Sequence, residues 1–505
     1  MKFLALILLA VSLLCSACGT TPAQTGKVFR YGTPAYGIAN ENTGMDPHEA
    51  YQGWSAIRYG VAETLFKFDD AMRPQPWLAE KYEFLDAYTV KITLKDNIYF
   101  SSGNKMTGDA VKACLEDLTA RHNRADNDLK ITGISASGQT VTITSSAKAP
   151  VLINYLCDPY GCIIDMSCGT DDDTKISGTG PFIVQSLTAK EIVLVKNPHY
   201  WDGTPQVDKI TVSSITDGNT LTLALQNGEI DAAQGLPYSS LPLFNNAAYT
   251  ISSADTSRTF QAAFNFNTPA LQDVRVRRAI AMSMDRKTFA RVQLLNNGIP
   301  AYSAFPPNLP FGSTDKPNAF NIQQARSLLA QADWTDSDGD GYVDKNGTPL
   351  TLRWLTYTSR QELPLLAEAA QSWLKDTGIR LEINATDGYA GYLRRGEWDI
   401  YAKAFVTAPT GDAQYYFTTH LGGSPYNSGN YRSSTAEALT QQLSGEFDPG
   451  KRAELAKQIS NVLNGDCAFI YIAHLKMPLV MKKSVHNLSA HPCDYYEITK
   501  DLTID

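Results

Sequence analysis

Hydrophobic and polar residues follow two different periods along most of this chain. Stretches that alternate between apolar and polar residues predict half-buried strands, and apolar residues three and four positions apart predict amphipathic helices. We expect strands over residues 28–31, 88–94, 140–145, 192–195, 209–212, 230–233, 350–357, 379–383, 398–401 and 468–472. We expect helices over residues 56–66, 110–120, 220–228, 273–284, 322–332, 362–377, 435–443 and 451–463.

The order of these elements indicates a mixed α/β fold with more than one domain. A strand over 350–357, a helix over 362–377 and a strand over 379–383 follow one another. That order predicts a parallel βαβ unit. The chain has 505 residues, more than one hydrophobic core normally serves, so two or three domains are expected.

The N-terminal segment departs from this periodic pattern. Lys2 precedes an uncharged apolar run over 3–14, and the small residues Ser16 and Ala17 stand before Cys18. This resembles a bacterial lipoprotein signal, in which cleavage before the cysteine is followed by lipidation of its thiol. An ordinary signal peptide or an anchor helix is the alternative, although a spanning helix needs roughly 20 apolar residues. We expect residues 1–17 to be removed, Cys18 to carry palmitate, and the rest to lie outside the cytoplasmic membrane.

The charge composition disfavours some classes of binding partner, and the cysteine count bears on disulfides. Charged residues make up 19% of the chain and the net charge is −8, which argues against nucleic acid or an anionic membrane surface as partner. Beyond Cys18, six cysteines remain, at positions 114, 157, 162, 168, 467 and 493. An even number outside the cytoplasm permits disulfides, with local pairing possible among the three in 157–168. Buried free thiols are the alternative, and the spacing is not that of a structural zinc site.

Several short motifs occur in order along nearly the whole chain. They are ETLFKFD at 63–69, PWLAEKYE at 76–83, VKITLKDNIYFSSG at 90–103, GTGPF at 178–182, KNPHYW at 196–201, LQNGEID at 225–231, FN at 264–265, DVRVRRAI at 273–280 and MDR at 284–286. Each motif is weak alone, but the ordered set resembles the family 5 solute-binding proteins, which serve peptide and nickel ABC transporters. We interpret the motifs as structural, with Gly178 and Gly180 in tight backbone and Trp77 and Trp201 as core anchors.

The resemblance implies a two-lobe fold of the periplasmic-binding-protein type (type II, cluster C) with an extra subdomain on lobe I. A ligand would be enclosed between the lobes by hinge closure. The expected bounds are 18–27 for a linker, 28–63, 190–262 and 470–505 for lobe I, 64–189 for the subdomain, and 263–469 for lobe II.

The resemblance also implies a monomeric extracytoplasmic receptor that delivers its ligand to the permease and ATPase subunits of an ABC importer. No catalysis is implied. A secreted hydrolase, the alternative class, is disfavoured because the chain contains neither G-x-S-x-G nor H-E-x-x-H.

The ligand class depends on the segment AFVTAPTGDAQYYF at 404–417, where the family reads its ligand. Peptide binders resemble W-x-A-D-Y-P-D-P there, and the first Asp, which pairs with the peptide's amino group, is absent. Nickel binders resemble W-G-A-P-Y-D-P-H, which Ala408, Pro409 and Asp412 fit better, although the Trp and the Tyr are missing. No Arg occurs in 156–162, where some nickel-chelate binders hold a carboxylate, so the chelator stays open.

We therefore expect nickel or another divalent metal bound as a small, histidine-like chelate, with a di- or oligopeptide as the alternative. No catalytic cofactor is expected. The residues expected to line the cleft are Tyr36, Thr410, Asp412, Tyr415, Tyr416, Tyr426, Asn427, Tyr431 and Tyr495.

Two of the seven histidines are candidate metal ligands, because nickel favours imidazole. His420 follows the ligand-reading segment, and His491 lies in a C-terminal segment that resembles one carrying a ligand histidine in some nickel binders. A chelate held by one protein histidine or by none is the alternative. We interpret the other five, at 48, 122, 199, 474 and 486, as structural or solvated.

One acidic loop has the D-x-D-x-D-G spacing of a calcium site. It begins at Asp336 and runs to Asp344, but position twelve is Gly347 instead of the bidentate Glu. We expect turn chemistry here, with calcium binding as the alternative.

Overall fold

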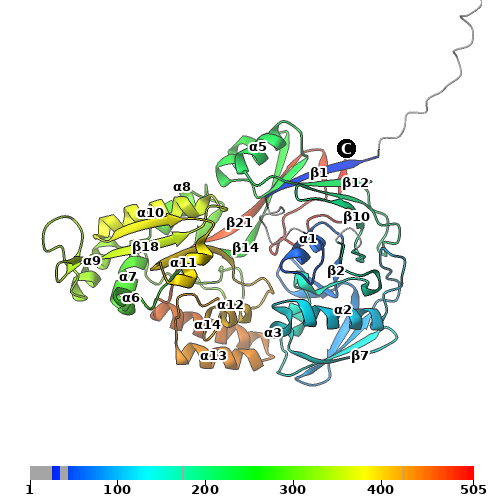
Figure 1. Cartoon of the computed structure of the whole chain (residues 1–505), viewed down its shortest axis with the longest axis horizontal. Helices are drawn as coiled ribbons and strands as arrows, with labels where there is room; N and C mark the ends of the chain where they lie inside the picture. The colour runs from blue at the N-terminus through cyan, green and yellow to red at the C-terminus, as the bar shows by residue number, and fades with distance from the viewer. Residues whose placement is uncertain (1–25, 35–43, 173–175, 425) are drawn as a thin grey trace, which may run out of the picture.

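The computed structural model describes residues 26–34, 44–172, 176–424 and 426–505. One large sheet runs through the molecule and connects its two lobes (Figure 1). Its strand order is β10-β11-β12-β1-β13-β21-β14-β20-β18-β19, with β15 beside β21. The bounds are β1 (Val28–Thr33), β10 (Phe182–Leu187), β11 (Glu191–Lys196), β12 (Lys209–Ser214), β13 (Ala232–Gln234), β14 (Tyr249–Phe264), β15 (Gly298–Pro300), β18 (Thr351–Thr356), β19 (Arg380–Ala385), β20 (Ile400–Val406) and β21 (Phe469–Lys482).

The two long strands β14 and β21 pass from one lobe to the other. On the lobe I side β21 pairs with β13, and on the lobe II side β14 pairs with β20. The antiparallel register between β14 and β21 shifts between Asp255 and Thr259, which lie opposite Lys476 and His474. This bulge falls where the neighbouring strands change, so it marks the hinge. The expected lobe boundaries at 262/263 and 469/470 fall inside these two strands and remain predictions.

Lobe I carries a subdomain built on a separate four-stranded sheet, β5-β6-β8-β7. Helix α2 begins at a Thr107 cap, whose side chain accepts a bond from the Ala110 amide, and packs on β7 and β8. The elements of this part are α1 (Gln52–Arg58), β2 (Glu63–Thr64), β3 (Phe66–Phe68), β4 (Pro74–Pro76), β5 (Ala79–Phe84), β6 (Thr89–Leu94), α2 (Gly108–Arg121), α3 (Ala125–Leu129), β7 (Ile131–Ser137), β8 (Thr140–Ser145), α4 (Leu152–Tyr155), η1 (Pro159–Gly161), β9 (Cys162–Ile163) and η2 (Met166–Cys168).

Buried Glu63 ties three of the sequence motifs together. Its carboxylate accepts hydrogen bonds from the Tyr200 hydroxyl at 3.0 Å, the Trp201 indole at 2.8 Å and the Thr179 hydroxyl at 3.0 Å. Burial raises the pKa of Glu63 to about 7 although these donors oppose the shift. Trp201 is therefore an anchor that also donates to a buried acid.

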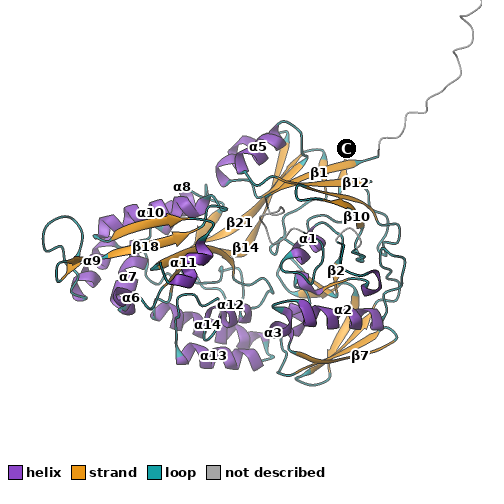
Figure 2. Cartoon of the chain, viewed as in Figure 1, coloured by secondary structure: helices purple, strands orange, loops and turns teal. Residues whose placement is uncertain are grey.

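Lobe II surrounds its end of the sheet with helices (Figure 2). The parallel unit β18-α10-β19 is present as expected, and α10 ends at Gly378 in the left-handed conformation. The remaining elements, including those around the hinge and the C-terminus, are α5 (Gly218–Gln226), η4 (Tyr238–Phe244), α6 (Pro269–Gln272), α7 (Val274–Ser283), α8 (Arg286–Val292), α9 (Ile322–Gln331), β16 (Asp344–Lys345), β17 (Thr348–Pro349), α10 (Glu362–Thr377), α11 (Tyr389–Arg395), α12 (Gln414–His420), α13 (Ser434–Gly445), α14 (Pro449–Gly465), β22 (Val485–His486) and β23 (Thr503–Ile504).

One expected helix differs from the structure, and the structure favours one of the two alternatives for the cysteines. The apolar stretch 56–66 forms only the end of α1, after which the chain turns at Gly60 (φ +70°) into the short strands β2 and β3. The apolar residues of 56–66 are buried on several sides of the chain, and their spacing in the sequence therefore resembles that of a helix. None of the six cysteines at 114, 157, 162, 168, 467 and 493 is disulfide-bonded in the described structure, and only Cys168 is exposed.

No helix within residues 26–34, 44–172, 176–424 and 426–505 has the length and apolar character that crossing a bilayer requires.

Candidate functional site

A cavity of about 550 Å³ lies between the lobes beside the hinge. Lobe I contributes α1 and the C-terminal segment, lobe II contributes the loop between β18 and α10, and the hinge strands form the floor. The residues that line it include Tyr51, Trp54, Arg58, Tyr238, Arg258, Arg360, Glu362, Met477 and Asp494. Aromatic, cationic and acidic groups therefore meet in one partly polar space between the lobes.

Three arginines make the lining of the cavity positively charged. Arg58 comes from the end of α1, Arg258 from the hinge bulge of β14, and Arg360 from the loop before α10. Their side chains are 3%, 17% and 27% exposed, respectively. The Nε atoms of Arg258 and Arg360 are buried and donate no hydrogen bond among the described residues, although Arg360 Nε lies 3.9 Å from Glu362 Oε2 in an ion pair. Buried donors without acceptors are costly, so these two suit an acceptor supplied by a ligand.

Asp494 holds two of these arginines together across the lobes. Its carboxylate oxygen Oδ2 lies 3.2 Å from Arg58 Nη2 and 3.5 Å from Arg258 Nη2. Its backbone carbonyl accepts a hydrogen bond from Arg58 Nε at 2.9 Å. Asp494 has a left-handed backbone (φ +55°), which directs both groups to the cavity side. Sequence reasoning missed this residue, although it lies in the C-terminal segment that we singled out.

Burial shifts the pKa values of the charged groups at the cavity. Burial lowers the pKa of Arg258 despite the opposing charge of Asp494. Burial would also lower the pKa of Arg58, but Asp494 and Glu497 together raise it. Glu497 lies 3.6 Å from Arg58 Nε, and burial raises the pKa of this carboxyl to about 7. The lining of the cavity therefore contains three arginines and two carboxylates, Asp494 and Glu362, and Glu497 lies behind it against Arg58.

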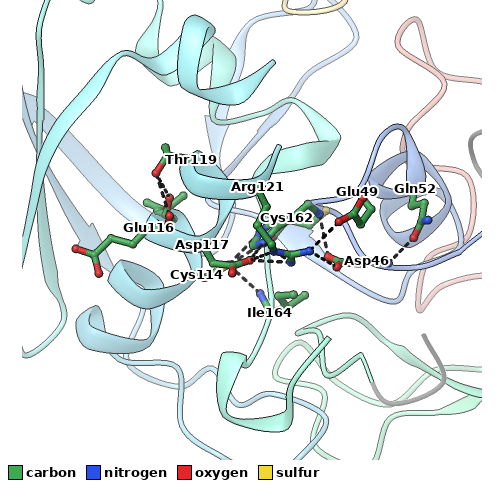
Figure 3. A network of polar contacts seen from close by, with 12 residues as sticks. Asp46, Glu49, Gln52, Cys114, Glu116, Asp117, Thr119, Arg121, Cys162 and Ile164 are labelled. Carbon is green, nitrogen blue, oxygen red and sulfur yellow. Dashed lines mark hydrogen bonds and ion pairs between the residues drawn. The ribbon is translucent and has the colours of Figure 1, made fainter. Parts of the chain in front are cut away.

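A polar network on α2 fixes the loop that leads into α1 (Figure 3). Arg121 bonds Asp46 at 2.9 Å and Glu49 at 3.1 Å, and Asp117 bonds His48 at 2.6 Å. His48 also lies 3.6 Å from the Cys114 thiol. This network positions Tyr51, Trp54 and Arg58 at the cavity wall, because they directly follow the anchored loop.

The Cys114–His48–Asp117 arrangement has the members of a nucleophilic triad but not its chemistry. Cys114 is 0% exposed, and burial raises the pKa of its thiol to about 12. A reactive cysteine needs an accessible thiolate. The interpretation of His48 as structural agrees with this setting.

The two candidate metal ligands lie apart from the cavity and are not brought together. His420 is buried in lobe II, where its ring stacks on Tyr416 at 4.3 Å and its Nε2 lies 3.1 Å from the Gln261 amide. Burial and then Lys403 lower the pKa of His420 well below its ordinary value. His491 lies at a second cavity of about 390 Å³ on lobe I, with its Nδ1 2.9 Å from the Cys493 thiol.

The residues of the ligand-reading segment serve the lobe contact and the lobe II core. Asp412 forms a two-pronged ion pair with Arg452, at 2.7 and 2.9 Å. Thr410 is 2% exposed, and Tyr416 belongs to the aromatic core. Tyr415 faces Arg124 of the subdomain.

The other expected cleft residues are spread over both lobes. Asn427 closes its own turn through bonds to Gly422 and Tyr431, and the Tyr431 hydroxyl donates to Asp466. Tyr426 is 45% exposed. Tyr495 packs its ring on cavity residue Trp54 at 5.5 Å. Tyr36 and Cys18 lie outside the described residues.

The acidic loop at 336–344 is exposed and folds on itself. Ligand oxygens of Asp336, Asp338 and Asp340 lie within 4.8 Å of one another. Asp336 and Asp338 accept amide bonds from Gly339, Asp340 and Gly341 at 2.8–3.1 Å. These bonds are those of the expected turns, and calcium binding stays the alternative.

Two lobes on shared hinge strands, with a buried polar cavity between them, define a ligand-enclosing binding protein. Residues 73–428 match the profile of the bacterial extracellular solute-binding proteins, family 5. The nickel-binding protein NikA of Staphylococcus aureus is 30% identical over 100% of both chains. A glutathione-binding protein, GsiB of Escherichia coli, is 26% identical over 90% of this chain and 89% of its own.

Solved structures agree with the sequence relatives. The crystal structure of NikA from Staphylococcus aureus in complex with Ni(L-His)2 superimposes with a TM-score of 0.83 at 29% identity, covering 95% of this chain and 100% of that chain. The chain therefore belongs to the bacterial extracellular solute-binding proteins, family 5. This confirms the resemblance and the two-lobe α/β fold expected from the motifs.

Proposed function

We propose that this protein is the lipid-anchored receptor of an ABC importer and that it binds a divalent metal, nickel first among the candidates, as a chelate with a small amino acid such as histidine. The ligand would occupy the cavity between the lobes. It would then pass to a permease driven by an ATPase subunit. The names of the relatives support the importer class and the metal.

The observation that carries the chelate is the set of three arginines, two of which have a buried Nε that donates no hydrogen bond among the described residues. In a complex of a divalent cation with two amino acids, the net charge is zero, yet each carboxylate still presents an oxygen to the outside. Arginine is the side chain best suited to bind such oxygens, because its guanidinium donates in a fixed planar fork. A bare cation, in contrast, would be repelled by three arginines.

The metal itself needs imidazole or similar donors. No histidine is among the described residues that line the cavity, so we propose that the chelator supplies most of the donors. A ligand role for His491 or His420 would require a rearrangement of the segments that hold them, and it stays a prediction.

A peptide is the second candidate, and one observation favours it. The same arginines can bind the carboxylates of a peptide, and one relative is named for glutathione, a tripeptide with two carboxylates. The competing requirement is a free acid for the peptide's amino group. Asp494 is already engaged by Arg58 and Arg258.

The test is calorimetry on protein freed of bound ligand by unfolding and refolding. The titrants are nickel chloride, L-histidine, a 1:2 mixture of the two, and glutathione. We expect tight binding of the mixture only. Binding of glutathione alone would favour the peptide candidate, and absence of binding by every titrant would contradict both.

A further inference from the structure

The turn before α12 brings the backbone of lobe II directly against the subdomain of lobe I. Gly411 in this turn has a left-handed backbone (φ +66°), and a Cβ added to it would lie 2.2 Å from the carbonyl oxygen of Met72. Heavy atoms do not approach so closely. The lobes can therefore adopt this closed arrangement only because residue 411 has no side chain.

The opposing surface on the subdomain is rigid. Asp69 organises a turn by accepting hydrogen bonds from the amides of Ala71 at 3.0 Å and Arg73 at 2.9 Å. It also accepts one from Arg73 Nε at 2.9 Å. Met72, within the turn, is 7% exposed and is itself left-handed (φ +59°), a conformation that costs free energy in a residue with a side chain. The Met72 carbonyl is thus held in place and cannot retreat freely.

Further contacts between the lobes surround Gly411. The Asn154 amide on the subdomain donates to the Thr410 carbonyl at 2.9 Å. The guanidinium of Arg124, held by Asp128 at 2.9 Å, lies over the rings of Tyr160 in the subdomain at 4.9 Å and of Tyr415 in lobe II at 5.5 Å. Figure 2 shows α3 on the side of the subdomain that faces the helices α12 and α13 of lobe II.

We propose that Gly411 and its contact with Met72 determine the ligand affinity of the receptor from outside the cavity. None of the described residues in this contact lines the cavity. A ligand that is enclosed by closure binds with an apparent Kd equal to the intrinsic Kd divided by the closed fraction. A side chain at 411 lowers that fraction, so affinity falls while the cavity is unchanged. The proposal rests on the receptor function but not on the identity of the ligand.

The experiment compares Gly411→Ala with a matched variant, Gly396→Ala. Gly396 is also in lobe II and left-handed (φ +69°), but a Cβ there meets nothing within 4 Å. Both variants carry the same local strain, and only Gly411→Ala carries the clash. With nickel and L-histidine as titrant, we expect the Kd to rise about tenfold or more for Gly411→Ala relative to Gly396→Ala. Asn154→Ala, which removes one contact without strain, is the second variant and should raise the Kd less.

A second measurement works without ligand. Asn154→Cys and Thr410→Cys in a Cys168→Ser background allow closure to be trapped with a short bifunctional thiol reagent. The rate of cross-linking, read by peptide mass spectrometry, should fall when Gly411→Ala is added and stay unchanged when Gly396→Ala is added.

The two measurements separate the proposals. Equal cross-linking rates and equal Kd values for the two alanine variants would overturn the role of Gly411. If the parent protein binds neither nickel with histidine nor glutathione, the proposed function fails, and the cross-linking rates still decide the role of Gly411. If Gly411→Ala does not fold, unchanged affinity in Asn154→Ala overturns the proposal.

Discussion

Replacement of Arg258 by methionine tests whether the cavity binds carboxylates. The side chain is 17% exposed, and its Nε donor has no partner within the described structure. Arg258→Met keeps an unbranched apolar side chain and removes the guanidinium with its charge and donors. Asp494 keeps its ion pair with Arg58 at 3.2 Å, so no unpaired acid is left behind. The loss should therefore appear in binding more than in folding.

The magnitude follows from one charged hydrogen-bonding group. A hydrogen bond to a charged group contributes about 1.5–3 kcal/mol. Since about 1.4 kcal/mol corresponds to a factor of ten, the Kd for nickel with L-histidine should rise roughly ten- to 150-fold. The melting temperature should change little, because the Nε donor of Arg258 makes no hydrogen bond within the described structure that the mutation could remove.

The assay is calorimetry with the 1:2 nickel and L-histidine mixture on wild type, Arg258→Met and Arg395→Met. Arg395 is a lobe II arginine that is 54% exposed and pairs only with Glu397 in the described structure. It controls for the loss of one positive charge. If the wild type binds and Arg258→Met binds equally well, the arginines do not bind the chelate and the reasoning is refuted.

Three further predictions concern other parts of the chain. Burial raises the pKa of Glu63 to about 7, so its contribution to the stability of the fold is present below its ordinary pKa and is lost as the pH rises through about 7. Glu63→Gln should remove on the order of 3 kcal/mol of that pH dependence. If the melting temperatures of wild type and Glu63→Gln change in parallel with pH, the prediction is contradicted. The predicted ligand role of His491 requires its segment to move from the second cavity to the one between the lobes. In that case His491→Ala weakens binding of nickel with histidine and His199→Ala does not, whereas equal affinities for wild type and His491→Ala would end the ligand role. Cys18→Ala should abolish incorporation of labelled palmitate and release the protein from the membrane, and continued labelling would show that the anchor lies elsewhere.

The regular elements were predictable where one face of each is buried. The strand 140–145 and the helix 362–377 are found as expected, because their apolar residues keep a single period. The hinge strand β14 was not predicted from the sequence. Its sequence from Tyr249 is rich in serine and threonine, and its burial alternates only weakly before Thr256 because that end covers little core.

The cavity was less predictable than the fold, for a physical reason. Arg58 lies at the end of α1, Arg258 in a strand bulge and Arg360 before α10, so no spacing in the sequence connects them. Asp494 was within a segment that we singled out, but histidine chemistry drew attention to His491, three residues earlier. In the structure Asp494 lines the cavity between the lobes and His491 lines a second one.

The position of the bulge in β14 also determines how far each part of the receptor moves when the lobes close. Arg258 lies in this bulge, and the segment that leads to Gly411 is bonded to it, because the Ala408 amide donates to the Ser257 hydroxyl at 3.1 Å. A rotation at the bulge that shifts these residues slightly therefore moves the outer edge of the subdomain further, since that edge lies farther from the hinge strands (Figure 1). A fluorescent dye on the exposed edge of the subdomain, near Tyr88, would sit on the long arm of this lever. Such a labelled protein would serve as an optical sensor for its ligand without any change to the cavity.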